Sequence, residues 1–184
     1  MCYPGAVAIL IPRRSATALA CRFGPIAVDQ HEVVSGDAEH TCYTLQLPDW
    51  VAVAAVTGVG RFVLVRQHRH GVDAVTLETP GGIIDPGEKP ELAALRELRE
   101  ETGYAADAVE PLGWVHPNPA LQGNRCHLYL ARGAREVGAP AGDEHESTEA
   151  VLMEADEVAA AVRDGRITHV LAILALERPL ARGR

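Results

Sequence analysis

Lysine is almost absent from this chain, and positive charge is nowhere concentrated in it. Lys89 is the only lysine, the other 16 of the 17 basic residues are arginines scattered along 184 residues, and the net charge is −8. Non-specific binding along a nucleic-acid backbone requires clustered Lys and Arg that displace counterions. The composition therefore argues against a nucleic-acid partner, although single arginines could still bind a small phosphorylated ligand.

Long apolar runs and paired cysteines are also lacking. The apolar run at residues 6–11 is far shorter than the roughly 20 residues that a membrane-spanning helix needs, and no basic residue precedes it as in a secretory leader. The four cysteines lie far apart and form no Cys-x-x-Cys pair, so neither a zinc site nor a dense disulfide framework is expected. These absences predict a protein without a membrane partner, in a reducing, cytoplasmic setting.

What is present is the composition of an ordinary globular domain, with 47% hydrophobic and 23% charged residues. Periodicity places most of the strands before the first clear helix. Strands are expected at 7–11, 27–34, 42–47, 51–56, 62–66, 112–115, 126–131 and 150–153, and helices at 89–102, 155–163 and 168–176. This pattern predicts an α+β protein, an αβα sandwich with a mixed sheet.

The helix expected at 89–102 has the clearest boundaries. Pro90 suits the first turn, where its missing N–H is not needed, and Gly103 suits the position after the last turn. At about 100° per residue, the helix carries leucines on one face and glutamates on the other. The two sets are Leu92, Leu95 and Leu98, and Glu97, Glu100 and Glu101.

The glutamate face is electrostatically unfavourable on its own. Carboxylates three and four residues apart repel each other by roughly a few tenths of a kcal/mol per pair, so we expect a cation to compensate. A solvated acidic face is the ordinary explanation of such a helix, but the neighbouring residues favour a metal. Glu88 adds a carboxylate, Gly81 and Gly82 allow close approach of the backbone, and Mg²⁺ prefers oxygen ligands.

The spacing of these residues resembles the Nudix box. In order, with five, seven, one and one intervening residues, the chain has Gly82, Glu88, Arg96-Glu97-Leu98, Glu100-Glu101 and Gly103-Tyr104. The segments at 65–69 (Val-Arg-Gln-His-Arg) and 77–82 (Leu-Glu-Thr-Pro-Gly-Gly) also resemble the ADP-ribose pyrophosphatase branch of the Nudix hydrolase family. Tyr104 departs from the general pattern, which prefers an aliphatic residue, but tyrosine is familiar at that place in the ADP-ribose branch.

The resemblance implies a Nudix fold and a magnesium site, in which manganese could substitute. Glu97 and Glu101 would be the main metal ligands, and Glu100 and Glu88 would complete the cluster. Gly81 aligns with the residue that lends its backbone carbonyl to the metal.

The resemblance also implies how the reaction proceeds. Arg96 would orient a glutamate of the box through a charge-assisted hydrogen bond, and Glu100 would belong to the catalytic cluster. Bridging ions would clamp the diphosphate and lower the pKa of a bound water. A loop carboxylate supplies the catalytic base in this branch, which favours Glu144 with Glu146 as the alternative; a merely solvated acidic loop would have no such role.

Arginines beside the box are candidates for substrate binding. Arg66 or Arg69 could grip a substrate phosphate, but either could instead form a surface ion pair. Glu78, which precedes the two glycines, is a further candidate for contact with substrate.

Three more candidates could each have a purely structural role. Trp50 could stack on a base, because aromatic faces bind nucleobases, or it could pack in the core. Asn118 and Pro119 occur in a proline-stiffened segment that could form a pocket wall, or they could simply turn the chain.

The function that follows is Mg²⁺-dependent hydrolysis of a nucleoside diphosphate linked to a second group, with ADP-ribose converted to AMP and ribose 5-phosphate. Nucleotide sugars or another Nudix substrate remain open, because residues of the box do not distinguish them. A nucleotide-sensing module without catalysis or a structural acidic protein would be non-enzymatic, and the complete set of carboxylates disfavours both.

The domain organisation follows from the same resemblance. Residues 1–48 would form a β-rich extension before a Nudix catalytic domain at 49–184. Because such an extension builds a homodimer in this branch, we expect two copies to associate.

Overall fold

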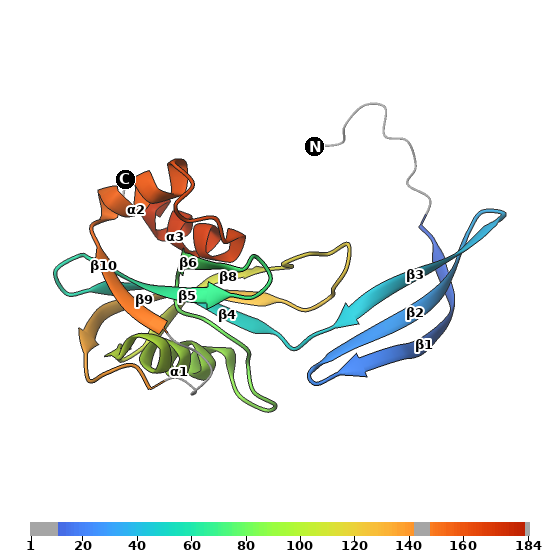
Figure 1. Ribbon diagram of the computed structural model, residues 1–184, viewed down its shortest axis with the longest axis horizontal. Coiled ribbons are helices and arrows are strands. Elements are labelled where there is room, and N and C mark those ends of the chain that lie inside the picture. Colours follow the sequence, from blue (N-terminus) through green and yellow to red (C-terminus); the bar gives the residue numbers. More distant parts are fainter. Residues whose placement is uncertain (1–10, 142–147, 183–184) are drawn as a thin grey trace. The chain divides into compact units, whose positions relative to one another are not determined.

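A computed structural model describes residues 11–141 and 148–182 of the chain, which falls into two compact units (Figure 1). The smaller unit comprises the chain up to residue 47 together with residues 118–124, and the larger unit comprises residues 48–117 and the chain from residue 125 onward. The smaller unit contains strands β1 (Arg13–Phe23), β2 (Ile26–Ser35) and β3 (Ala38–Gln46). The larger unit contains strands β4 (Trp50–Thr57), β5 (Phe62–Arg69), β6 (Ala74–Glu78), β7 (Tyr104–Ala105), β8 (Val109–Val115), β9 (Cys126–Glu136) and β10 (Thr148–Met153), and helices α1 (Pro90–Thr102), α2 (Ala155–Arg163) and α3 (Val170–Arg182).

The smaller unit is an antiparallel sheet in the order β1-β2-β3. Strands β2 and β3 overlap the strands predicted at 27–34 and 42–47. Periodicity does not predict β1, because residues 18–21 (Ala-Leu-Ala-Cys) follow one another without apolar–polar alternation. Two register shifts also interrupt the pairing of β1 with β2. The strand predicted at 7–11 lies outside the described residues except for Ile11, which is not in a strand.

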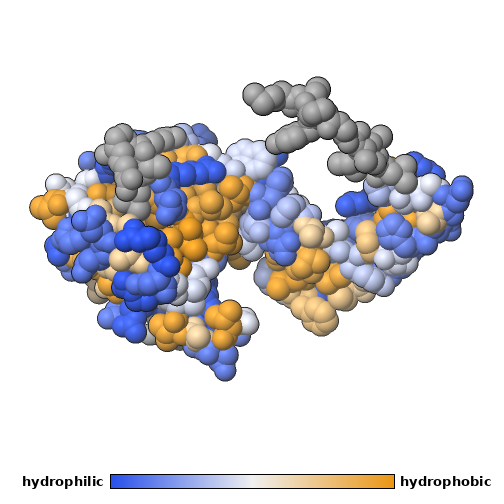
Figure 2. All heavy atoms as spheres, turned by 90° about the horizontal axis from the view of Figure 1, so that it is seen from above, coloured by the Kyte–Doolittle hydropathy of each residue, from blue (hydrophilic) through white to orange (hydrophobic). Residues whose placement is uncertain are grey.

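Apolar side chains reach the surface of this sheet, as the space-filling view shows (Figure 2). The large ones are Leu19, Phe23, Ile26 and Tyr43. By contrast, His31 is buried and hydrogen-bonds through its two ring nitrogens to hydroxyl groups from both neighbouring strands.

The larger unit is built on a seven-stranded mixed sheet in which β10-β5-β4-β9-β7 run in order, β6 pairs with β5 and β8 pairs with β9. Strands β4 and β9 are parallel, and the other pairs are antiparallel. Periodicity does not predict β6, because it is only five residues long and folds back on β5 after a tight turn.

Side chains of β4 alternate between two hydrophobic cores, because successive residues of a strand point to opposite faces of the sheet. Val51, Val53 and Ala55 pack with the buried residues of α1. Ala52 and Ala54 pack instead with the apolar residues of α2 and α3 on the opposite face. Figure 1 shows the resulting layers, with α1 on one side of the sheet and α2 and α3 on the other, so the predicted αβα arrangement is confirmed.

Helix α1 begins and ends close to the predicted bounds. Pro90 occupies its first turn, and Gly103, with a φ of 72°, caps its end by donating its N–H to the carbonyl of Arg99. Along the leucine face of α1, Leu98 is buried, but Leu92 is 55% exposed. The buried side also includes Ala93 and Ala94, because these small residues allow the helix to lie close to the sheet.

The helices predicted at 155–163 and 168–176 correspond to α2 and α3, although α3 begins two residues later and extends to Arg182. Among the residues that the structure describes, no helix is both long and apolar enough to cross a membrane.

Candidate active site

The side chain of Arg96 links α1 to the loop that precedes it. Its Nε and Nη2 atoms donate to the two carboxylate oxygens of Glu88 at 3.0 and 2.9 Å, and Nη2 also donates to the carbonyl of Ile83 at 3.0 Å. Its Nη1 donates to Glu97 at 2.8 Å and to Glu100 at 3.1 Å. The hydrogen bonds that Arg96 donates to Glu88 outweigh the effect of burial and raise the pKa of Arg96 well above its usual range. The guanidinium is therefore a permanent cation shared by three carboxylates.

Gly81 and Gly82 bring the backbone directly against the glutamates of α1. The N–H of Gly81 donates to Glu101 at 2.8 Å, and a Cβ at Gly82 would lie 2.5 Å from Oε1 of Glu97. A Cβ at Gly81 would collide with the carbonyl oxygen of Val51 in β4. Position 81 therefore requires glycine because of close approach to the backbone, whereas a methyl group at position 82 would displace the carboxylate of Glu97.

The carboxylates around these glycines fit a hard divalent cation by the chemistry of their donors, because they offer only oxygen. Arg96 already supplies part of the compensating positive charge that the sequence pattern demands. Within residues 11–141 and 148–182, no three acidic, histidine or cysteine side chains are arranged as a ready-made metal cluster. The roles of Glu97, Glu100, Glu101 and Glu88 as ligands thus remain a prediction.

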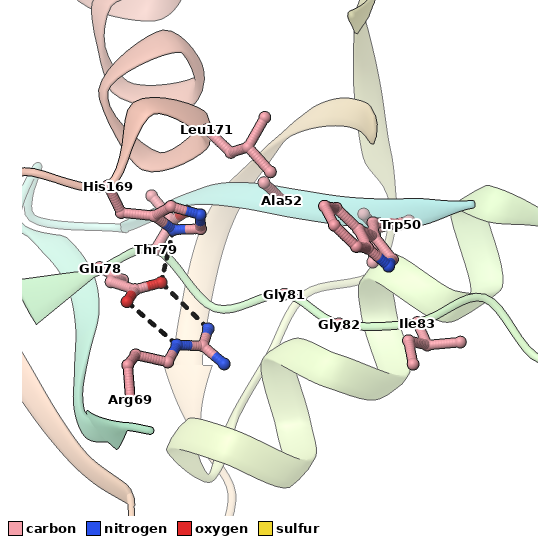
Figure 3. A pocket seen from close by; sticks show the side chains of 11 residues that line it. Trp50, Ala52, Arg69, Glu78, Thr79, Gly81, Gly82, Ile83, His169 and Leu171 are labelled. Carbon is pink, nitrogen blue, oxygen red and sulfur yellow. Dashed lines mark hydrogen bonds and ion pairs between the residues drawn. The ribbon is translucent and has the colours of Figure 1, made fainter. Parts of the chain in front are cut away.

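A pocket of about 300 Å³ lies beside the segment that contains the two glycines (Figure 3). Trp50 and Ile83 line one end of the pocket, and Arg69, Glu78 and His169 line the other. The remaining lining residues are small or mainly apolar: Val51, Ala52, Thr79, Gly81, Gly82 and Leu171. The volume is at the lower limit for ligand pockets and suits one part of a nucleotide derivative.

Glu78 at the polar end of the pocket is only 2% exposed, and three side chains hydrogen-bond to it. Arg69 donates from Nε at 3.1 Å and from Nη2 at 3.0 Å, and the hydroxyl of Thr76 donates at 2.6 Å. Nδ1 of His169 lies 2.5 Å from Oε2 of Glu78. Burial raises the pKa of Glu78, but these hydrogen bonds outweigh it and hold the pKa well below its usual range. The carboxylate is therefore ionised and acts only as an acceptor.

His169 is a residue of this site that the sequence did not indicate. It immediately precedes α3, whereas its partner Glu78 ends β6, a strand that periodicity does not reveal. No local motif marks a histidine of this kind, because its significance depends on which distant carboxylate the fold places beside it.

The structure places the other candidate substrate residues differently. Arg69 and Glu78 lie together in the pocket, where Arg69 donates two hydrogen bonds to Glu78. Arg66 forms an ion pair with Glu149 at 3.1 Å in which both side chains are more than half exposed, so it has the surface ion pair that the sequence also allowed. Trp50 lines the pocket and also packs against the core next to α3, so its core packing is confirmed and its stacking on a base stays a prediction.

Asn118 and Pro119 are not among the residues that line the pocket. Asn118 and Pro119 belong to the smaller unit, where the carbonyl of Asn118 accepts hydrogen bonds from the N–H groups of Leu121 and Gln122 in a turn. Glu144 and Glu146 lie outside the described residues.

Comparison with known proteins gives a family match over most of the chain. The model of the NUDIX domain matches residues 47–171, which include the box, the pocket and β4 to the start of α3. A crystal structure described as an ADP compounds hydrolase has a TM-score of 0.83, with 96% of each chain covered at 19% identity. At that identity the similarity demonstrates the fold alone.

Several relatives are similar in sequence. The methanol dehydrogenase activator of Bacillus methanolicus is 31% identical over 83% of this chain and 82% of its own length. The ADP-ribose pyrophosphatase of Mycobacterium tuberculosis is 36% identical over 67% of this chain and 60% of its own length. The ADP-ribose pyrophosphatase of Bacillus subtilis is 39% identical over 46% of this chain and 45% of its own length.

Proposed function

Because this chain belongs to the Nudix hydrolase family, we propose that it is a Mg²⁺-dependent pyrophosphatase whose substrate is ADP-ribose. The observation that carries the proposal is the position of the two glycines. They hold the backbone against Glu97 and Glu101 and also line the pocket. A diphosphate bound beside this segment would have the acidic cluster within reach while its attached group enters the pocket.

The chain supplies the binding and orientation that this reaction needs. Glu97 and Glu101, supported by Glu100 and Glu88, would hold Mg²⁺, with the backbone carbonyl of Gly81 as a further ligand. When bound, the metal would polarise the diphosphate and lower the pKa of the attacking water.

Arg96 acts by positioning the carboxylates. Its guanidinium bonds to glutamates from both the loop and the helix, so it fixes their relative places without needing contact with the substrate. Its permanent charge also reduces the mutual repulsion of these carboxylates before a metal binds. We assign proton removal from the water to Glu144, with Glu146 as the alternative.

The choice of ADP-ribose rests on the relatives and on the pocket. Two similar proteins are named ADP-ribose pyrophosphatases, and the segments at 65–69 and 77–82 resemble that branch. The pocket has an aromatic and apolar lining with one polar end, which suits a ring system that carries hydroxyl groups. Nucleotide sugars share these properties and are the alternative substrate class.

The test is an assay of the purified protein with ADP-ribose and millimolar Mg²⁺, in which AMP and ribose 5-phosphate are separated and measured. We expect stoichiometric formation of both products and complete loss of activity when EDTA is added. If the protein turns over a nucleotide sugar faster than ADP-ribose, we would assign that nucleotide sugar as the substrate instead of ADP-ribose. The absence of metal-dependent turnover across nucleotide sugars, dinucleotides and triphosphates would overturn the enzyme assignment, and tight binding without turnover would favour a nucleotide sensor.

Assembly is the second part of the proposal. A three-stranded sheet with exposed apolar side chains is poorly suited to stand alone. We therefore assign the N-terminal extension, residues 1–48, to the interface of a homodimer.

The three described cysteines are free thiols, which fits the cytoplasmic setting expected from the sequence.

A further inference from the structure

We propose that His169 recognises a sugar hydroxyl of the substrate, and that Glu78 positions the imidazole for this purpose. The inference rests on the proposed function, because it concerns the group that enters the pocket beside the two glycines. It gives a role to a buried carboxylate and a histidine that the chemistry of the Nudix box leaves unused.

The hydrogen bond between His169 and Glu78 defines which ring nitrogen carries a proton. Ionised Glu78 can only accept, so Nδ1 of His169 must donate across the 2.5 Å that separate them. In the neutral imidazole, Nε2 then carries a lone pair and is an acceptor. A carboxylate behind a histidine orients the ring in the same way that it orients metal-binding histidines elsewhere.

The geometry directs this acceptor into the pocket. Figure 3 shows the second ring nitrogen of His169 pointing away from Glu78, toward the side of the pocket on which Ala52 and Leu171 lie. The side chain of His169 is 37% exposed, whereas that of Glu78 is 2% exposed. The imidazole therefore offers the pocket a hydrogen-bonding atom that the buried carboxylate cannot offer directly.

The charges at the polar end favour a neutral ligand group over a phosphate. Arg69 is the one arginine among the lining residues, and it directs its Nε and Nη2 donors to Glu78, so the two charges compensate each other. A phosphate placed here would meet no unmatched positive charge from these two side chains. A hydroxyl can donate to Nε2 of His169 while its carbon ring contacts apolar neighbours such as Leu171.

Two substitutions of His169 test the roles of its two ring nitrogens separately. The amide of Asn in His169→Asn lies near the position of Nδ1, so it can still donate to Glu78 but offers nothing at Nε2. The longer side chain in His169→Gln reaches the position of Nε2 and restores a hydrogen-bonding atom in the pocket. The probes are ADP-ribose and analogues of it that each lack one secondary hydroxyl of either ribose.

For wild type, we expect one analogue to have a kcat/KM about three- to tenfold lower than ADP-ribose, as the loss of one neutral hydrogen bond predicts. His169→Asn should raise the KM for ADP-ribose by a similar factor, leave kcat within about twofold, and remove the difference between ADP-ribose and that analogue. His169→Gln should recover part of the discrimination. The identity of the sensitive analogue tells whether the hydroxyl belongs to the nucleoside or to the distal ribose.

The inference is overturned if His169→Asn lowers kcat/KM for ADP-ribose and all analogues equally, since a structural role has that effect. It is also overturned if wild type does not distinguish any analogue from ADP-ribose. Should wild type fail to turn over ADP-ribose at all, the proposed function fails, and equilibrium binding of the same probes in EDTA then decides the role of His169. Loss of discrimination by His169→Asn in that binding assay supports the inference, and unchanged discrimination or no binding by wild type refutes it.

Discussion

Glu78 carries its negative charge almost entirely out of contact with water, and the fold compensates it with Arg69, Thr76 and His169. Replacing it by Gln should destabilise the protein by about 2–3 kcal/mol at pH 7, because the partners lose a charged acceptor. This loss of unfolding free energy is at the lower end of the range for a broken buried ion pair, because Arg69 is 41% exposed. Urea unfolding of the two proteins measures the difference.

The effect of Glu78→Gln should also depend on pH. The pKa of Glu78 in the folded protein is below its ordinary value of 4.5, so its contribution to stability is present above that pH and declines as the pH falls below it. The difference between wild type and variant should therefore shrink between about pH 5 and pH 3. Glu110→Gln is the control, since Glu110 and its partner Arg132 are both exposed. A difference that stays constant across this range would show that the charge of Glu78 does not matter.

Glu101 is the box carboxylate for which substitution most cleanly separates metal binding from folding. Glu101→Gln retains an oxygen that can accept from the N–H of Gly81, so the fold should survive. We expect the rate to fall by about a hundredfold or more, as losing several kcal/mol of transition-state stabilisation implies, and Mg²⁺ to bind more weakly. Steady-state kinetics as a function of Mg²⁺ concentration measures both effects, and an unchanged rate in a variant with a lowered melting temperature would indicate a structural role instead.

Glu144 and Glu146 should behave differently from Glu101. A catalytic base outside the metal ligands keeps its basicity, so Glu144→Gln should lower kcat strongly while changing KM and Mg²⁺ affinity little. Parallel measurements on Glu146→Gln identify the base: if only this variant loses activity, Glu146 has the role. If both variants retain the wild-type kcat, neither glutamate is the base and the box must provide it.

At the scale of elements, the segment of Gly81 and Gly82 determines how closely α1 approaches the pocket. A methyl group in Gly82→Ala would push against the carboxylate of Glu97, which is the flexible end of a side chain. The variant should therefore fold, yet lose activity on the order of a hundredfold, because misplacing a catalytic group by about 1 Å has effects of that size. Melting temperature and kcat measured together test this prediction.

The matched variants distinguish a local from a general effect of an added methyl group. Gly58→Ala adds its Cβ to open space and should leave both quantities unchanged. Gly81→Ala meets the backbone of Val51, which cannot move aside, and should lower the melting temperature. Full activity of Gly82→Ala would mean that the position of Glu97 is unimportant for catalysis.

The elements that sequence predicts well are those with local signals. Helix α1 is delimited by Pro90 and Gly103, whose backbone properties act within a few residues, and β4 and β5 have apolar runs of strand length. Strands β1 and β6 lack such signals. Strand β1 consists mainly of small and polar residues, and strand β6 is stabilised by its pairing with β5. Their existence depends on tertiary pairing that local periodicity does not contain.

The candidate site also has one part that local sequence signals predict and another part that depends on the tertiary fold. Glu97, Glu100 and Glu101 lie on one helix, so helical geometry brings them together before anything is known of the fold. The resemblance predicts that Arg96 bonds to one box glutamate, and it bonds to Glu97, Glu100 and Glu88. The pairing of His169 with Glu78 joins two distant elements and could not be anticipated from spacing. Helical phase places Leu92 on the same face as Leu98, but phase alone does not say which side of the helix meets the sheet, and Leu92 is exposed.

At the scale of the whole molecule, the proposed homodimer is testable in solution. We expect a particle of about 39 kDa, twice the chain mass of 19.7 kDa. Leu19 and Phe23 are 57% and 71% exposed in the smaller unit and should be covered in the dimer, as apolar patches at interfaces usually are. Sedimentation velocity at micromolar concentration measures the mass.

The paired variants test where the copies meet. The double variant Leu19→Ser and Phe23→Ser should dissociate the dimer, whereas Val59→Ser should not, although Val59 in the larger unit is 77% exposed. A monomeric wild type contradicts the prediction, and a dimer unaffected by the double variant places the interface elsewhere.

The alternation of side chains along β4 also constrains how this lineage can evolve. The N–H groups of Val51 and Val53 donate hydrogen bonds to the carbonyls of Gly82 and Pro80. Successive side chains of β4 pack into the cores on opposite faces of the sheet. Inserting or deleting a single codon within β4 would exchange the two sets and turn Trp50 away from its present face. Natural length variation should therefore accumulate in turns such as 58–60, and β4 should keep its length even where its residues diverge.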